Sequence, residues 1–171
     1  MKILILSQYF WPENFRINDL ALDLQANNVD VTVLTGSPNY PDGIVFKDFK
    51  KNKNNFNNLK KISIIRVPII PRGKSKVQLA LNYLTFIISA STIGIWKLRK
   101  HNFDYVIFFG TSPTTSGIPA VLISKIFNAP LITWILDIWP DTLLALGTIK
   151  SKLILNAISY LVSIIYKNSD Y

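Results

Sequence analysis

The chain has 171 residues, no cysteine and one histidine, His101, and its formal net charge is +9. A chain of this length fits one domain with a core of its own. The lack of cysteine excludes a disulfide scaffold and a thiolate metal site, and one histidine leaves little for a histidine-based metal centre. The apolar run after Lys2 breaks at Ser7 and Gln8 without a small-residue cleavage site, so no signal peptide is predicted.

The positive charge is concentrated in residues 45–76, which carry ten Lys or Arg residues and one acid, Asp48. Basic and acidic residues balance over the rest of the chain. One basic face is therefore expected, with anionic lipid, a diphosphate or nucleic acid as candidate partners. A solvated loop rich in Lys and Asn explains the segment equally well. Few aromatic residues are interleaved and no recognition motif is present, so no nucleic-acid partner is predicted.

The first 36 residues predict a strand, a helix and a second strand. Residues 2–8 form the apolar, β-prone run typical of a strand buried on both faces, and residues 29–35 form another. Between them, apolar residues recur at helical spacing: Ile17, Leu20, Ala21 and Leu24. This unit implies a parallel sheet with a right-handed crossover. Ligands of doubly wound sheets bind beyond the carboxyl ends of the strands, so residues 9–16 are expected at a crevice.

The remaining pattern predicts one α/β domain over residues 1–171, with a Rossmann-like, doubly wound parallel sheet. Further strands are expected at residues 61–67, 103–109 and 130–136, and helices at 77–96, 115–127, 142–146 and 152–167. Residues 46–58 are expected to form a mobile, polar excursion. Another strand would usually begin near Ser169–Tyr171, so a domain truncated at its C-terminus is expected.

Residues 77–96 contain no charged side chain, and a run of 20 residues meets the length threshold for a membrane span. Polar residues such as Gln78 and Asn82 interrupt the run, and spanning would remove a crossover helix from the sheet. We therefore predict a long helix that packs partly on the sheet and touches a bilayer surface with one apolar side. A wholly buried core helix is the alternative.

Several side chains after the predicted strands are candidates for a binding site. The first loop has no glycine, which argues against a dinucleotide fingerprint. Arg16 can receive an anionic group at the start of the helix, while Glu13 can bind a sugar hydroxyl or act as a base. Helix capping is the alternative for Glu13 and Asn14.

The later loops add hydroxyls, a carboxylate and an indole. Thr111 and Ser112 follow the fourth long strand, where they suit phosphate or sugar hydroxyls or cap a helix. Asp137 follows the next strand, and a carboxylate there is costly unless it is used or paired. Its alternative role is a buried helix cap. Trp139 offers a flat apolar face of the kind that stacks on sugar rings.

Four motifs occur in order at these strand ends: Gln8-Tyr-Phe-Trp-Pro-Glu13, Thr35-Gly-Ser-Pro-Asn-Tyr-Pro-Asp-Gly43, Ser112-Pro113 and Asp137-Ile-Trp-Pro-Asp141. The chain resembles the N-terminal half of family-4 glycosyltransferases of the GT-B fold over essentially all of its length. It is most similar to the branch that transfers fucosamine or fucose in bacterial O-antigen and capsule polysaccharide biosynthesis.

The resemblance implies a retaining, metal-independent hexosyltransferase without a cofactor. Its N-terminal domain binds an undecaprenyl-diphosphate-linked sugar acceptor at the inner face of the plasma membrane, and a second domain binds the UDP- or GDP-linked donor. This second domain, with its paired-glutamate motif, is missing here, so the chain alone is expected to be inactive. Many relatives have a histidine where Leu136 and Asp137 stand.

The resemblance implies that Glu13, Asn14 and Arg16 line the cleft, Tyr40 the acceptor side, and Asp137 the reaction centre. The expected protein is cytoplasmic and peripheral at an anionic membrane surface. The alternative is a non-catalytic subunit that recruits a separately encoded donor-binding chain to the membrane.

Overall fold

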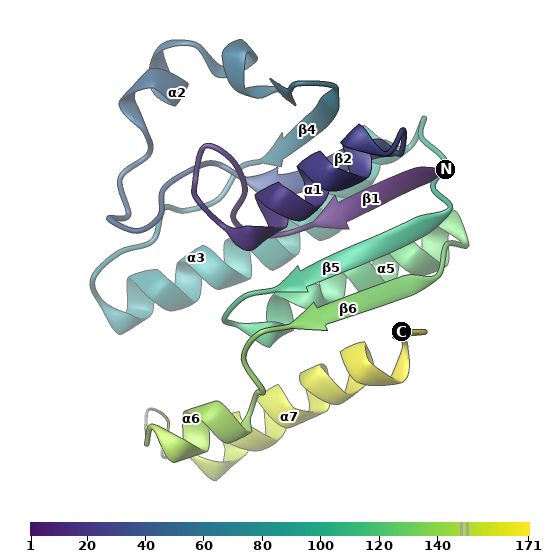
Figure 1. The fold of residues 1–171 in the computed structure, drawn as a ribbon. Helices are drawn as coiled ribbons and strands as arrows, with labels where there is room; N and C mark the ends of the chain where they lie inside the picture. The colour runs from purple at the N-terminus through teal and green to yellow at the C-terminus, as the bar shows by residue number, and fades with distance from the viewer. Residues whose placement is uncertain (148, 150) are drawn as a thin grey trace.

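The computed structural model describes residues 1–147, 149 and 151–171. Its centre is a six-stranded sheet in the order β3-β4-β2-β1-β5-β6 (Figure 1). All neighbouring strands pair in parallel except β3 and β4, which are antiparallel. The strands are β1 (Lys2–Leu6), β2 (Asp30–Gly36), β3 (Asn58–Leu59), β4 (Ile62–Val67), β5 (Tyr105–Gly110) and β6 (Leu131–Ile135). The predicted Rossmann-like α/β fold is confirmed, with a short antiparallel strand added at one edge.

Helices cover both faces of the sheet (Figure 1). They are α1 (Arg16–Ala26), α2 (Lys47–Lys51), α3 (Lys76–Ser89), α4 (Ile95–Leu98), α5 (Ile118–Phe127), α6 (Asp141–Ala145) and α7 (Lys152–Lys167). Short turns of other helical types are the 3₁₀ segments η1 (Lys53–Phe56) and η3 (Thr114–Gly117) and the π segment η2 (Ala90–Gly94). Helix α5 ends at Phe127, as the range 115–127 predicts, and Asn128 takes a left-handed conformation at its C-cap.

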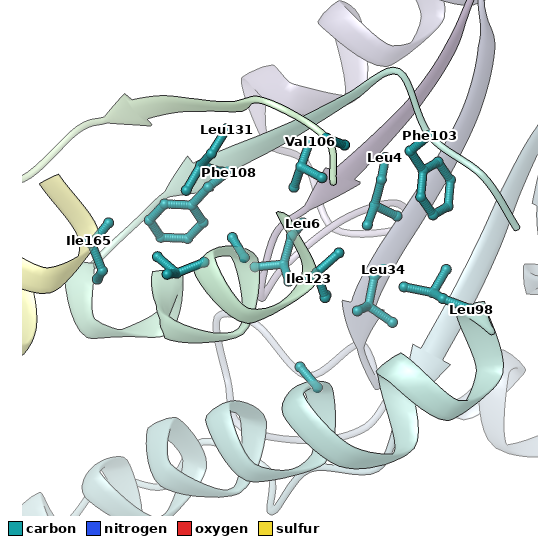
Figure 2. Close-up of a cluster of buried hydrophobic side chains, with 14 of the residues drawn as sticks. Leu4, Leu6, Leu34, Leu98, Phe103, Val106, Phe108, Ile123, Leu131 and Ile165 are labelled. Carbon is teal, nitrogen blue, oxygen red and sulfur yellow. The ribbon is translucent and has the colours of Figure 1, made fainter. Parts of the chain in front are cut away.

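Successive side chains of β1 point to opposite faces of the sheet, so the core is divided into two clusters. Ile3 and Ile5 pack on one side with Ile17 and Ala21 of α1. On the other side, side chains of the strands pack against α3, α5 and α7, as Figure 2 shows for Leu4, Leu6, Leu34, Phe108, Ile123 and Ile165. Each fully buried Leu, Ile or Phe contributes about 1.5–3 kcal/mol relative to an exposed one. Burial on both faces explains why the central strands have continuous apolar sequences.

The long apolar helix packs on the sheet with one side only. A capping box of Ser75 and Gln78 starts α3, and Asn82, Phe86 and Ala90 are buried. The combined helix Lys76–Leu98 is long and apolar enough to cross a membrane, but core helices of soluble proteins also meet these criteria. Only 28% of its most apolar 18-residue stretch is buried. An apolar stripe remains exposed: Val77, Leu81, Leu84, Ile88 and Trp96. The alternative of a wholly buried core helix is therefore wrong.

The expected irregular excursion at residues 46–58 is instead built from α2, η1 and the start of β3. Phe49 is buried, and its ring centroid lies 5.7 Å from that of Phe56 and 5.3 Å from the guanidinium carbon of Arg66. The predicted polar character is confirmed, because every residue of 46–58 except Phe46, Phe49 and Phe56 is exposed, but short helices replace the expected irregular chain and these aromatic side chains pack toward the sheet. The surrounding Lys and Asn residues hide this signal in the composition.

Candidate functional site

Four loops meet at the carboxyl ends of the parallel strands. They comprise residues 7–15 after β1, 37–46 after β2, 111–113 after β5 and 136–140 after β6. Because these strands run in the same direction, their carboxyl ends lie at one edge of the sheet (Figure 1). Each of the four sequence motifs contributes residues to one of these loops, and this edge is the candidate site.

Glu13 joins the first loop to the second. It is only 2% exposed. Its Oε1 accepts hydrogen bonds from the backbone N–H groups of Asn39 (2.8 Å) and Tyr40 (2.7 Å), and its Oε2 accepts one from Phe10 (3.2 Å). The carboxylate therefore holds two loops, rather than capping α1, whose N-cap is Phe15.

Burial raises the pKa of Glu13 to about 7 from its ordinary value of 4.5, and this effect outweighs the three backbone N–H donors and the charge of Arg66, which lower the pKa. The folded state thus binds this proton more tightly than the unfolded chain. The stabilisation is complete below pH 4.5 and is lost as the pH rises through about 7. Such a shift corresponds to roughly 3 kcal/mol.

We expect Glu13→Gln to flatten the pH dependence of unfolding. Wild type should lose stability relative to this variant between pH 4.5 and about 7, because only wild type gives up the buried proton. Urea unfolding at a series of pH values measures the difference. Asp19→Asn, an exposed acid in the first turn of α1, is the control and should keep the wild-type slope. Parallel pH curves for wild type and Glu13→Gln would refute the assignment.

Tyr40 lies in an aromatic cluster beside the Glu13 carboxylate. Its ring centroid is 5.2 Å from that of Tyr9 and 5.1 Å from that of Phe15. The guanidinium carbon of Arg72 lies 5.4 Å from the Tyr40 ring, and the Arg72 backbone N–H donates to Asn39 Oδ1 at 2.7 Å. Tyr40 is half-buried, so part of it remains open to solvent.

A buried polar network connects the first loop to α3. Asn82 Oδ1 accepts hydrogen bonds from Gln8 Nε2 (2.7 Å) and Tyr9 Oη (3.1 Å), and Asn82 Nδ2 donates to the Ile70 carbonyl oxygen (2.6 Å). Burial raises the pKa of the Tyr9 phenol, which keeps it protonated as a donor. In the sequence, Asn82 is visible only as a polar interruption of an apolar helix. That interruption was the available signal for this network.

Arg66 is a second residue that the sequence reasoning missed. It is 9% exposed, and it donates to the carbonyl oxygens of Gly36 (2.9 Å) and Trp11. Burial lowers the pKa of Arg66 to about 10, which leaves it charged at neutral pH. A single arginine in an apolar strand is the sequence signal that could have identified it.

Asp137 lies at the other end of the edge, after β6. Its side chain is half-buried, and its carbonyl oxygen accepts a hydrogen bond from Thr114 Oγ1 at 2.8 Å. Helix α6 begins at Asp141 with Pro140 at the N-cap, so Asp137 does not cap it. Within residues 1–147, 149 and 151–171, no hydrogen bond is made by the Asp137 carboxylate. The carboxylate is therefore available to a ligand.

The remaining candidates differ in exposure. Asn14 and Arg16 are exposed at the start of α1, and Ser112 is half-buried. Thr111 Oγ1 and Trp139 Nε1 are buried and have no hydrogen-bond partner in the described part of the chain. Unpaired buried polar atoms of this kind are uncommon in folded proteins. The structure thus brings Glu13 and Tyr40 together, and it joins the loops of Ser112 and Asp137 through Thr114.

Among the described residues, no group of three or more His, Asp or Glu side chains is arranged to hold a metal ion. The groups at the edge include the Asp137 carboxylate, hydroxyls, an indole and aromatic rings. These groups suit hydrogen bonding to, and stacking on, a neutral polyhydroxylated ligand such as a sugar.

No protein-family model matches the sequence, and no curated protein matches it. Among solved structures, the fold is similar to that of apo UGT2 from Phytolacca americana, a UDP-glycosyltransferase, with 13% identity and a TM-score of 0.50. The match covers 88% of this chain and 34% of UGT2, so the chain spans about a third of that protein.

The C-terminal domain of a hydrogenase from Pyrococcus furiosus is a second structural neighbour, with 16% identity and a TM-score of 0.46 over 77% of this chain and 89% of that domain. At such identities the similarity concerns the fold alone. The chain thus has a Rossmann-like α/β fold, and one of its structural neighbours is a GT-B glycosyltransferase.

Proposed function

We propose that the chain is the acceptor-binding half of a retaining family-4 glycosyltransferase. It would act in the transfer of a deoxy- or aminohexose from a nucleotide-sugar to a lipid-linked sugar during O-antigen or capsule synthesis. The observation that carries the proposal is the gathering of four motif loops at one edge of a parallel sheet. The fold similarity to UGT2 supports a glycosyltransferase more generally.

In this proposal each residue has a role that its environment supports. Asp137 contacts the transferring sugar, because its carboxylate is unpaired within the described residues. Trp139 stacks on a sugar ring, while Thr111 and Ser112 bind hydroxyls or phosphate. Glu13 positions the loops through three backbone N–H groups, and Tyr40 forms the acceptor side beside it.

The proposal also gives roles to two exposed residues at the rim of the cleft and a place to the nucleotide-sugar donor. Asn14 and Arg16 are exposed and lie at the rim, where Arg16 can receive an anionic group of the substrate. A UDP- or GDP-linked donor would bind mainly to a second domain outside this chain.

A second candidate is a non-catalytic subunit that recruits a donor-binding chain to the membrane. The exposed apolar stripe of α3 favours it, because Lys74 and Lys76 precede the stripe and Lys97, Arg99 and Lys100 follow it. Apolar side chains rimmed by basic residues are typical of segments that lie on anionic bilayers. Both candidates predict a peripheral position at the cytoplasmic membrane face.

Binding to nanodiscs separates the two candidates. An acceptor-binding domain should bind neutral nanodiscs only when they contain an undecaprenyl-diphosphate-linked sugar. A recruiting subunit should bind anionic nanodiscs without that lipid, and high salt should release it. The variant Leu84→Ser with Ile88→Ser removes two exposed apolar side chains and should weaken only the binding to anionic lipid. Failure to bind either kind of nanodisc would contradict both candidates.

A further inference from the structure

A cavity of about 640 Å³ lies beside β4. Strand β3 pairs with β4 only at Ile62 and Ser63, so the outer edge of β4 is uncovered by β3 beyond Ser63. The segment of α2 and η1 and the helix α4 contribute the other walls through Phe49, Lys53 and Lys97. The volume lies within the range of about 300–1,000 Å³ that small-molecule sites occupy.

The charges around this cavity are of one sign. Lys53, Arg66 and Lys97 line it, and no Asp or Glu side chain does. Lys97 Nζ donates to the Arg66 carbonyl oxygen at 2.8 Å, which directs its ammonium group toward the edge of β4. The acid of this segment, Asp48, pairs instead with Lys51 at 3.8 Å, and Lys51 is outside the lining. The lining therefore carries three cations and no acid, and Glu13, which interacts with Arg66, lies outside it.

Arg66 supplies a buried donor that lacks a partner. Its two terminal nitrogens donate to the carbonyl oxygens of Gly36 and Trp11, but its Nε is buried without a hydrogen bond to any described residue. An unsatisfied donor on a charged group is costly, and negative charge in the neighbouring cavity would offset that cost. The amide of Asn57 and the hydroxyl of Ser63 line the same cavity and can donate to such an anion.

We propose that the cavity binds a phosphorylated small molecule. Lys53 and Lys97 donate to the phosphate oxygens, and the buried guanidinium of Arg66 adds positive charge beside them, while Phe49 and Pro68 contact the body that carries the phosphate. A phosphate monoester carries about −1.5 to −2 charges near pH 7, which matches three cations better than a single carboxylate does. The cavity borders the second loop at Ser37, but none of the residues that line it has a role in the proposed glycosyltransferase, so either proposal can fail without the other.

Titration calorimetry with inorganic diphosphate, at constant ionic strength and against a sulfate reference, tests the proposal. Wild type should show saturable binding at one site per chain. Lys53→Gln combined with Lys97→Gln should weaken that binding about tenfold or more, because two charge-assisted hydrogen bonds are lost. Lys50→Gln combined with Lys51→Gln removes the same number of charges from α2, outside the cavity, and should change the affinity less than about twofold by screening alone.

Amide resonances give a readout that does not depend on a variant. Diphosphate should shift the Asn58 and Ser63 signals of wild type in a saturable manner, since both residues line the cavity. Phosphatidylcholine vesicles with phosphatidic acid test a lipid headgroup as the source of the phosphate. If the chain binds these vesicles and Lys53→Gln with Lys97→Gln weakens that binding, the phosphate comes from a lipid. If the chain binds diphosphate but not the vesicles, the ligand is soluble. Equal losses in the two double variants, or no saturable binding to either probe, would overturn the proposal.

Discussion

Replacing Asp137 with Asn is expected to lower turnover on the order of a hundredfold in an enzyme that joins this chain to a donor-binding domain. The Asp137 carboxylate lies at the carboxyl edge of the sheet, and no described residue pairs with it. There it can stabilise positive charge that develops on the transferring sugar. Asn keeps the shape and removes the charge, so folding should be retained while kcat falls.

The control is Asp141→Asn, an exposed acid at the start of α6. It removes a negative charge four residues away, and turnover should stay close to wild type. Steady-state kinetics on both variants, with circular dichroism to verify folding, make the comparison. If Asp137→Asn retains near-normal turnover, Asp137 does not act on the sugar.

Gly43→Ala is expected to destabilise the fold on the order of 3 kcal/mol, and to lower Tm by on the order of 10 °C. Gly43 has a φ of +70°, and a Cβ placed there would lie 1.6 Å from the Arg72 carbonyl oxygen. The opposing atom belongs to the backbone, so it cannot rotate away. The Gly43 N–H also donates to the carbonyl oxygen of Asn39 at 2.7 Å, and the Asn39 N–H is one of the donors to Glu13.

Gly147→Ala provides the matched control. Gly147 also has a positive φ, +59°, but a Cβ there would meet no atom of the described residues within 4 Å. Gly147→Ala should therefore destabilise the fold by only about 1–2 kcal/mol, the cost of placing alanine in a left-handed conformation. Thermal or urea unfolding of both variants measures the difference. Equal losses would mean that the contact with Arg72 does not constrain the second loop.

The sequence predicts most of this fold because continuous apolar runs and helical periodicity are local signals. The run in β1 and the spacing of Ile17 and Ala21 in α1 are sufficient to predict a parallel sheet, and the structure agrees. The two-residue strand β3 is too short to leave such a pattern. The ordered segment around Phe49 depends on contacts with Arg66, which lies far along the chain.

The details of the candidate site depend on contacts that sequence spacing does not encode. Glu13 meets backbone N–H groups of Asn39 and Tyr40, 26 and 27 residues away, and a backbone donor leaves no signature in residue type. The Gln8–Asn82 hydrogen bond spans 74 residues. The motifs therefore locate the edge of the sheet, but the partner of each polar side chain becomes clear only in three dimensions.

Sugar transfer, measured with and without a donor-binding chain, tests the acceptor-binding role most directly. The assay combines the purified chain with UDP- and GDP-linked sugars and an undecaprenyl-diphosphate-linked sugar in membranes. The chain alone should form no product, and a donor-binding chain added in trans should restore transfer that the Asp137→Asn variant then loses. Turnover by the chain alone would contradict the proposal that it supplies only the acceptor-binding half.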